Sequence, residues 1–462
     1  MEVINEYSNL LFQSLPIFKF SHSYSLLIII LLSIIALVLL ITWGKFNPFL
    51  AFLVVSIAAG LALGIPLNNI ARSVEKGIGD TLDDLVIIIG LGAMLGKLVA
   101  ESGAAQKITD VLMQIFGVKN ISWALMITGF IAGIPLFYNV GFVLLVPLIF
   151  SIVYQYKLPA VYTGVPMLAA LSVTHGFLPP HPSPTALVGQ FGADLGLTLL
   201  YGIVIAVPTI IIAGPLFART LKKISSQPLQ IFQPRSVAAD QLPGTANSFL
   251  TSLLPVLLLA STTLLPYLYK PQGKAAEVMG FLAEPSIVML IAVLMAAFTL
   301  GKGSGKSMKE VMNIYGDAMK DIAPILLIVA GAGVLKQVFT DSGVDDEIAA
   351  ALKQLPAPPL VLGWAMAAII RVCIGSATVA GLTAAGILGP VLPAMETDAN
   401  LMVLSIGAGS LMFSHVNDSG FWLFKEYFNL SIKDTIRSWS LMETIVAIAG
   451  LAGVLVLEAI IR

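Results

Sequence analysis

The chain has 462 residues, of which 57% are hydrophobic and only 11% are charged. An average soluble chain carries roughly a quarter of charged residues, so this composition excludes a soluble globular protein. The mean hydropathy is +0.93, and apolar runs such as residues 24–43 reach the roughly 20 residues that a bilayer requires. The formal net charge of −1 gives no basis for electrostatic binding to nucleic acid. The sequence predicts an all-α polytopic membrane protein.

The few residues able to bind a metal or carry out catalysis are scattered. Cys373 is the single cysteine, which excludes an intramolecular disulfide. The chain has 4 histidines and no Cys/His cluster with metal-ligand spacing, so we expect no metal and no cofactor. Neither a G-x-S-x-G elbow nor an H-E-x-x-H motif is present. An enzyme is not expected, and an intramembrane enzyme that uses His and Asp for acid–base chemistry is the weaker alternative.

Apolar runs in chain order divide the sequence in two. The first set lies at residues 24–43, 49–66, 82–101, 121–138, 140–155, 160–178 and 194–218. The longest polar stretch follows at 219–248, and its Lys and Arg residues are typical of a cytoplasmic segment. The second set lies at 249–269, 281–300, 322–340, 359–375, 376–395, 400–417 and 440–461. We therefore predict an N-terminal transmembrane repeat (1–218), a cytoplasmic linker (219–248) and a C-terminal transmembrane repeat (249–462).

The two halves correspond at a constant offset of 240 positions. Gly141 falls on Gly381, and His175 falls on His415, so 2 of the 4 histidines are in register. Lysines follow the run that ends near residue 300, whereas acidic residues follow the run that ends near 340. This asymmetry, with a weaker one in the first half, places equivalent loops on opposite sides of the membrane. The pattern predicts two inverted-topology repeats, an architecture that favours a secondary transporter.

One matched pair of segments interrupts the apolar runs with Gly and polar residues. GIPLFYNVGF (133–142) contains Asn139 and Gly141, and its counterpart is RVCIGSATVAG (371–381). We interpret both as re-entrant hairpins or broken helices, whose free N–H groups bind an anion near the membrane midplane. Ser376 and Thr378 add hydroxyl groups. The alternative is that the small residues only permit close helix packing.

A second matched pair is THGFLPPHPSPTA (174–186) and SHVNDSGFW (414–422). The prolines of the first segment cannot continue a helix, so His175 and His181 lie at a break. In the second segment His415, Asn417 and Asp418 gather hydrogen-bonding groups that are costly to bury unless they are paired or used. A structural role is the alternative, in which Asp418 holds the hairpin through local backbone N–H groups.

Arg371 is an isolated charge at the end of the apolar segment WAMAAII. A guanidinium at that depth needs a cavity or a partner, and its fork matches a carboxylate. The partner is either Asp418 or the carboxylate of a bound substrate. Charges near the ends of predicted spans, among them Asp83 and Lys336, are expected to snorkel to the interface.

The motifs GIPLFYNVGFVLLVPLIF, HGFLPPHPSPTA, RVCIGSATVAG and SHVNDSGFWLFKEYF resemble the gluconate permease family of bacterial proton symporters. The resemblance implies proton-driven uptake of gluconate or a related sugar acid by a multi-pass protein of the bacterial inner membrane. Other small carboxylates, such as an amino acid, and a passive anion channel are the alternatives, and a homodimer is left open. The sequence departs from the family pattern at Asn139, often acidic in the family, and at Ser183, where glycine is usual.

These arguments give two sets of candidate site residues. The predicted substrate-binding residues are Asn139, Gly141, His181, Arg371, Ser376, Thr378 and Asn417. The predicted proton-coupling residues are His175, His415 and Asp418, because His titrates near neutral pH and a carboxylate beside Arg371 can exchange its partner on protonation. Since the amide of Asn139 cannot titrate, another group must carry the proton.

Overall fold

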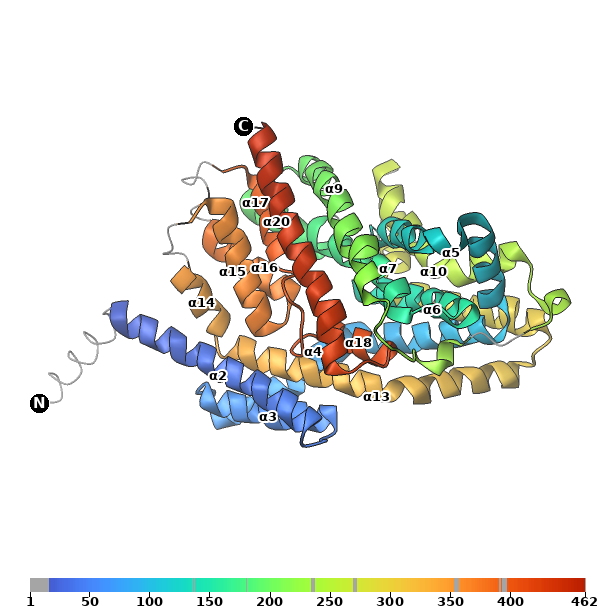
Figure 1. The fold of residues 1–462 in the computed structure, drawn as a ribbon, viewed down its shortest axis with the longest axis horizontal. Helices are drawn as coiled ribbons and strands as arrows, with labels where there is room; N and C mark the ends of the chain where they lie inside the picture. The colour runs from blue at the N-terminus through green and yellow to red at the C-terminus, as the bar shows by residue number, and fades with distance from the viewer. Residues whose placement is uncertain are drawn as a thin grey trace, which may run out of the picture.

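In the computed structural model, all regular secondary structure of the described residues is helical, which confirms the predicted fold class (Figure 1). The described residues are 16–134, 136, 138–179, 181–233, 237–268, 272–352, 357–389, 392 and 397–461. Within them, 7 helices are long and apolar enough to cross a membrane. The predicted span end at residue 395 and Arg235 of the polar stretch lie outside the described residues.

The helices follow one another with short connections. Before the polar stretch they are α2 (Pro16–Thr42), α3 (Pro48–Ala62), α4 (Leu67–Glu101), α5 (Ala104–Gly133), α6 (Tyr138–Tyr156), α7 (Ala160–Phe177), α8 (Pro182–Phe191) and α9 (Leu195–Ile211). After it they are α10 (Thr245–Leu268), α11 (Lys274–Ala283), α12 (Pro285–Ala296), α13 (Met308–Asp341), α14 (Val344–Leu352), α15 (Pro359–Ile374), α16 (Ala377–Leu388), α17 (Ala399–Gly409), α18 (Ser419–Tyr427), α19 (Ile432–Thr435) and α20 (Leu441–Ile461). Single π-helical turns occupy Ile212–Leu216, Ala297–Gly301 and Ile436–Ser440.

Both predicted pairs of helix breaks are present. α5 is separated from α6 by residues 134–137, and α15 from α16 by residues 375–376. α7 is separated from α8 by residues 178–181, and α17 from α18 by residues 410–418. Asn139 and Gly141, expected inside the first break, belong to the first turn of α6. α15 and α16 have 16 and 12 residues, fewer than a straight span requires, as expected for a re-entrant hairpin.

α4 and α13 are equivalent helices, because adding the offset of 240 to the bounds of α4 gives nearly those of α13. A methyl group added at Gly77 would come within 2.6 Å of the Cα atom of Val334, so the two backbones touch there. Further along α4, Lys97 Nζ lies 3.0 Å from Asp321 Oδ2. As residue numbers rise in α4 they fall in α13, so the helices are antiparallel, as inverted repeats require (Figure 1).

Two helix ends differ from those expected from hydropathy. α4 begins at Leu67 rather than 82, because residues 67–81 form a polar helix that a search for apolar runs misses. α17 ends at Gly409 rather than 417. The chain then forms turns up to Asp418, which leaves the polar segment 410–418 free to hydrogen-bond with side chains and with neighbouring helices.

The polar stretch packs against the helices that follow the second break. The Leu229 N–H group donates to the carbonyl of Tyr427 at 2.9 Å. The buried ring of Phe232 stacks on Tyr427, with ring centroids 5.8 Å apart, and also contacts Phe150. This stretch therefore connects α6 in the first half to α18 in the second.

Candidate functional site

The helix breaks of both halves meet at one cavity of about 830 Å³. Segments of α4, α6, α7, α13, α15, α16 and α20 line it, together with the loop before α18. The predicted site residues in its wall are Asn139, His175, Arg371, Ser376, Thr378, Asn417 and Asp418. The fold thus brings seven of the ten candidates together from distant parts of the sequence.

Arg371 and Asp418 form a buried ion pair at this cavity. A guanidinium nitrogen of Arg371 donates to Asp418 Oδ2, which also accepts from the hydroxyl of Ser414. The other oxygen, Oδ1, accepts from the backbone N–H of Gly420 at 2.9 Å, so Asp418 caps α18. Arg371 is 5% exposed. Asp418 is therefore the protein partner of the arginine, and its own hydrogen-bonding capacity is largely used.

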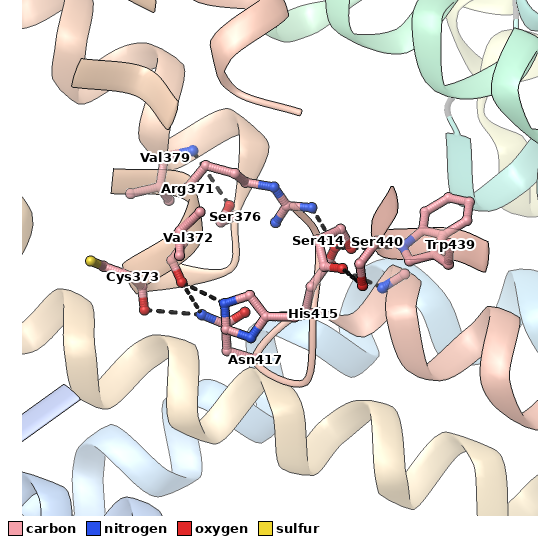
Figure 2. Close-up of polar contacts among 12 residues, drawn as sticks. Arg371, Val372, Cys373, Ser376, Val379, Ser414, His415, Asn417, Trp439 and Ser440 are labelled. Carbon is pink, nitrogen blue, oxygen red and sulfur yellow. Dashed lines mark hydrogen bonds and ion pairs between the residues drawn. The ribbon is translucent and has the colours of Figure 1, made fainter. Parts of the chain in front are cut away.

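The tip of the α15–α16 hairpin is held by side chains of the loop before α18 (Figure 2). Asn417 Nδ2 donates to the carbonyls of Val372 at 2.9 Å and Cys373 at 3.0 Å. His415 Nε2 lies 2.8 Å from the same Val372 carbonyl. These bonds satisfy carbonyls at the end of α15 that have no partner within the helix.

Gly375 terminates α15 with a φ of 82°, the left-handed region that favours glycine. A Cβ atom at this position would lie 2.2 Å from the backbone oxygen of Asn417. The hairpin tip and the loop before α18 can approach this closely only because residue 375 has no side chain. Ser376 follows as the N-cap of α16, where its Oγ accepts from Val379 N–H at 3.4 Å.

The π-helical turn Ile436–Ser440 orients two side chains toward the same loop. Trp439 Nε1 donates to Ser414 Oγ at 2.7 Å, and Ser440 Oγ donates to the Ser414 carbonyl at 2.5 Å (Figure 2). Single π turns inside helices are frequent at functional sites. One turn further on, Glu443 enters the wall of the cavity.

Glu443 is a functional candidate that the sequence analysis missed. It is 2% exposed, and its carboxyl group is hydrogen-bonded to Ser172 of α7. The signal that could have found it is an acidic residue near the start of the apolar run 440–461, because ionisable residues within spans are rare and mark functional sites.

Several polar atoms in the cavity wall have no hydrogen-bond partner among the described residues. They are Tyr138 Oη, His175 Nδ1, Arg371 Nε, Asn417 Oδ1 and Glu443 Oε2. Buried polar groups are nearly always satisfied, so a cluster of unsatisfied ones around a cavity indicates a polar ligand. Arg371 and Tyr138 supply donors, and Asn417 supplies an acceptor. The cavity therefore offers both kinds of hydrogen bond to one molecule.

Helix N-termini add positive potential to this wall. α6, α8, α16 and α18 all begin at it, through Tyr138, Pro182, Ala377 and Ser419. Free N–H groups and the helix dipole at such ends favour a negative charge. Asp83 and Lys336 also line the cavity instead of only reaching toward the membrane surface.

The other three predicted residues lie behind the cavity wall. Gly141 packs against Leu171, whose Cδ2 would be 2.8 Å from an added Cβ. His181 is buried, with Nε2 lying 2.8 Å from the carbonyl of Gly133, and its ring contacts that of His175. His415 binds the Val372 carbonyl as described above. In the structure these residues support the wall.

The sequence matches the GntP family permease over residues 25–460. It is 47% identical over 437 residues to the high-affinity gluconate transporter of Escherichia coli K12, covering 94% of this chain and all of that protein. The Gnt-II system L-idonate transporter of the same organism is 44% identical with the same coverage, as is a gluconate permease of Bacillus subtilis 168 over 448 residues.

The chain belongs to the GntP permease family. The family resemblance predicted from the motifs is thereby confirmed, and this member is a permease rather than an enzyme. It is a multi-pass protein of the bacterial inner membrane. The cavity between its broken helices is accordingly the candidate transport site.

Proposed function

We propose that this permease takes up gluconate or a related sugar acid together with protons. The observation that carries the proposal is the cavity, which combines a buried arginine, four helix N-termini and unsatisfied donors and acceptors. A sugar acid is the complementary ligand, since it has one carboxylate and a row of hydroxyl groups. The names of the relatives, which transport gluconate or L-idonate, support the same substrate class.

In this proposal Arg371 Nε and the N-terminus of α16 hold the substrate carboxylate, because a guanidinium keeps its charge and binds carboxylates through parallel N–H groups. Asn139, Ser376, Thr378 and Asn417 bind the hydroxyl groups from the two sides of the cavity. Gly141 and His181 act indirectly by fixing α6 and the end of α5.

Proton coupling supplies the driving force for accumulation. A sugar acid anion that moves with one proton carries no net charge, so a pH gradient drives uptake directly. We propose His175, His415 and Asp418 as the residues that the sequence indicates for this coupling. His175 lines the cavity and its Nδ1 atom has no hydrogen-bond partner among the described residues, whereas Asp418 is paired with Arg371 and His415 binds a backbone carbonyl.

The membrane arrangement belongs to the same proposal. Residues 1–218 and 249–462 form the two repeats, and residues 219–248 lie in the cytoplasm with their Lys and Arg residues. A homodimer is compatible with it. The cytoplasmic location is tested with a Lys222→Cys variant that also lacks Cys373. A membrane-impermeant thiol reagent added outside intact cells should not label the new cysteine.

The decisive experiment is uptake of labelled gluconate into liposomes that contain the purified protein. With an inside pH one unit above the outside pH, one proton per substrate supports about tenfold accumulation, because 1.4 kcal/mol corresponds to a factor of ten. A protonophore should abolish accumulation. Gluconate flux without accumulation would identify a passive anion channel, and absence of gluconate flux would redirect the search to other hydroxy or amino acids.

A further inference from the structure

Glu443 differs from the other acidic residue at the centre of the site. Asp418 has a guanidinium, a hydroxyl and a backbone N–H group as partners. Glu443 has a hydrogen bond to Ser172, and its Oε2 atom has no partner among the described residues. Both carboxyl groups line the same cavity. An ionised carboxylate is therefore well stabilised at Asp418 and poorly stabilised at Glu443.

The groups around Glu443 come from several elements. Arg371 of α15 and Asp418 act on it electrostatically with opposite signs, and Tyr138 of α6 lies close enough to interact with its charge. His175 of α7 lines the same cavity, one helical turn from Ser172. α9 and α17, which also pack against α20, contain no charged residue. Since Arg371 is already paired, no cation within hydrogen-bonding distance neutralises Glu443 in the described part of the chain.

We propose that Glu443, rather than His175, His415 or Asp418, is the group that binds and releases the transported proton, an inference that rests on the proposed proton-coupled uptake. In the ionised state Glu443 only accepts hydrogen bonds. When a proton from the open side binds Oε2, the neutral acid gains an O–H donor that points into the cavity. That donor can bind a substrate hydroxyl, so substrate and proton stabilise each other's binding. Release on the other side regenerates the carboxylate.

This assignment explains the geometry of the site. Isolated buried carboxylates are costly, so a membrane protein keeps one where a proton is exchanged. The anion site at Arg371 and the proton site at Glu443 face one cavity, so a movement that changes access to one changes access to both. Coupling follows if the protein changes from outward-facing to inward-facing only when the cavity holds both the substrate anion and the proton, so that their charges balance.

The test is Glu443→Gln, which mimics the protonated side chain and cannot titrate. Its matched control is Glu458→Gln, the same change on the same helix away from the cavity lining. Each variant and the wild type are reconstituted in liposomes, and two quantities are measured. They are the accumulation ratio of labelled gluconate under a one-unit pH gradient, and exchange of external labelled gluconate for internal unlabelled gluconate without a gradient.

We expect Glu443→Gln to lower the accumulation ratio from about ten to about one, because one coupled proton supplies about 1.4 kcal/mol under this gradient. Exchange of gluconate should continue. The control should retain both activities. Accumulation by Glu443→Gln equal to that of the wild type would overturn the proposal, and so would equal loss of accumulation and exchange, which indicates a binding or structural role. A wild type that exchanges gluconate but never accumulates it would instead refute proton coupling itself.

Discussion

The helix breaks α5–α6 and α15–α16 occupy equivalent places in the two halves but differ in chemistry. In the second half Arg371 and Asp418 form an ion pair. Their counterparts at the constant offset are Ile131, which is 64% exposed, and Leu178, which is fully buried. The first tip therefore has no charge at the positions where the second tip has two. Both halves have the helix breaks, and only the second half has the ion pair at these positions.

The histidines show a second asymmetry. His175 and His415 occupy equivalent positions, yet only His415 binds the last turn of the preceding hairpin helix, through Val372. In the first half it is His181 that contacts the last turn of α5, with Nε2 2.8 Å from the carbonyl of Gly133. His175 lines the cavity, and its Nδ1 atom has no hydrogen-bond partner among the described residues. Equivalent positions in a repeat thus need not have equivalent roles.

Removing the charge from the second tip should have the largest effect. We expect Arg371→Gln to weaken gluconate binding at least about 30-fold, since truncating a buried charge partner costs about 2–5 kcal/mol or more, and about 1.4 kcal/mol corresponds to a factor of ten. The variant also leaves Asp418 unpaired, which destabilises the fold. The double variant with Asp418→Asn should recover thermal stability without recovering uptake. Undiminished affinity in either variant would remove Arg371 from the substrate site.

Adding one methyl group at the second tip should have the next largest effect. Gly375→Ala combines a φ that costs alanine about 1–2 kcal/mol with a backbone clash at Asn417. Gly192→Ala is the matched control, because its φ is also positive and nothing lies within 4 Å of the added atom. Thermal unfolding in detergent should show a much larger drop in Tm for Gly375→Ala than for Gly192→Ala. An equal drop in Tm for the two variants would mean that the tip of the α15–α16 hairpin is not tightly packed.

The two equivalent histidines should separate stability from transport. His415→Gln weakens the bond to Val372 and should cost about 1 kcal/mol of stability, with uptake less affected. His175→Gln removes no described hydrogen bond but alters the cavity wall, so uptake should fall with stability unchanged. Thermal unfolding and initial uptake rates of both variants check this. The reverse pattern would show that the histidines have kept equivalent roles.

The smallest effect is expected at Ser183, one of the two positions where the sequence departs from the pattern that the family resemblance implies. Ser183 lines the cavity beside Gly381, at 3.3 Å from where a Cβ would lie. Ser183→Gly removes one hydroxyl, so gluconate affinity should change by no more than about fivefold, the value of one neutral hydrogen bond. Competition by L-idonate, measured in parallel, should reveal any shift in preference. A larger change would make Ser183 a specificity determinant.

The sequence predicted the breaks well because proline, glycine and clustered polar residues have local effects on a helix. The same reasoning identified Arg371 with Asp418, since a buried guanidinium requires a partner. It missed Glu443, because the features that single this residue out, its neighbour Ser172 on α7 and the π turn before α20, appear only once the chain is folded. It also placed Asn139 in a break, because hydropathy does not mark the first turn of a helix.

The length of the antiparallel pair α4 and α13 has a consequence for the bilayer. With 35 and 34 residues at 1.5 Å per residue, each helix is about 50 Å long, whereas the hydrocarbon core is about 30 Å thick. They must therefore tilt or extend into the headgroup layers. Because their backbones touch at Gly77, we expect the two helices to change tilt together. A change in tilt of this pair would then adapt the protein to a thinner or thicker membrane. The short helices α15 and α16 would keep the same depth in the bilayer.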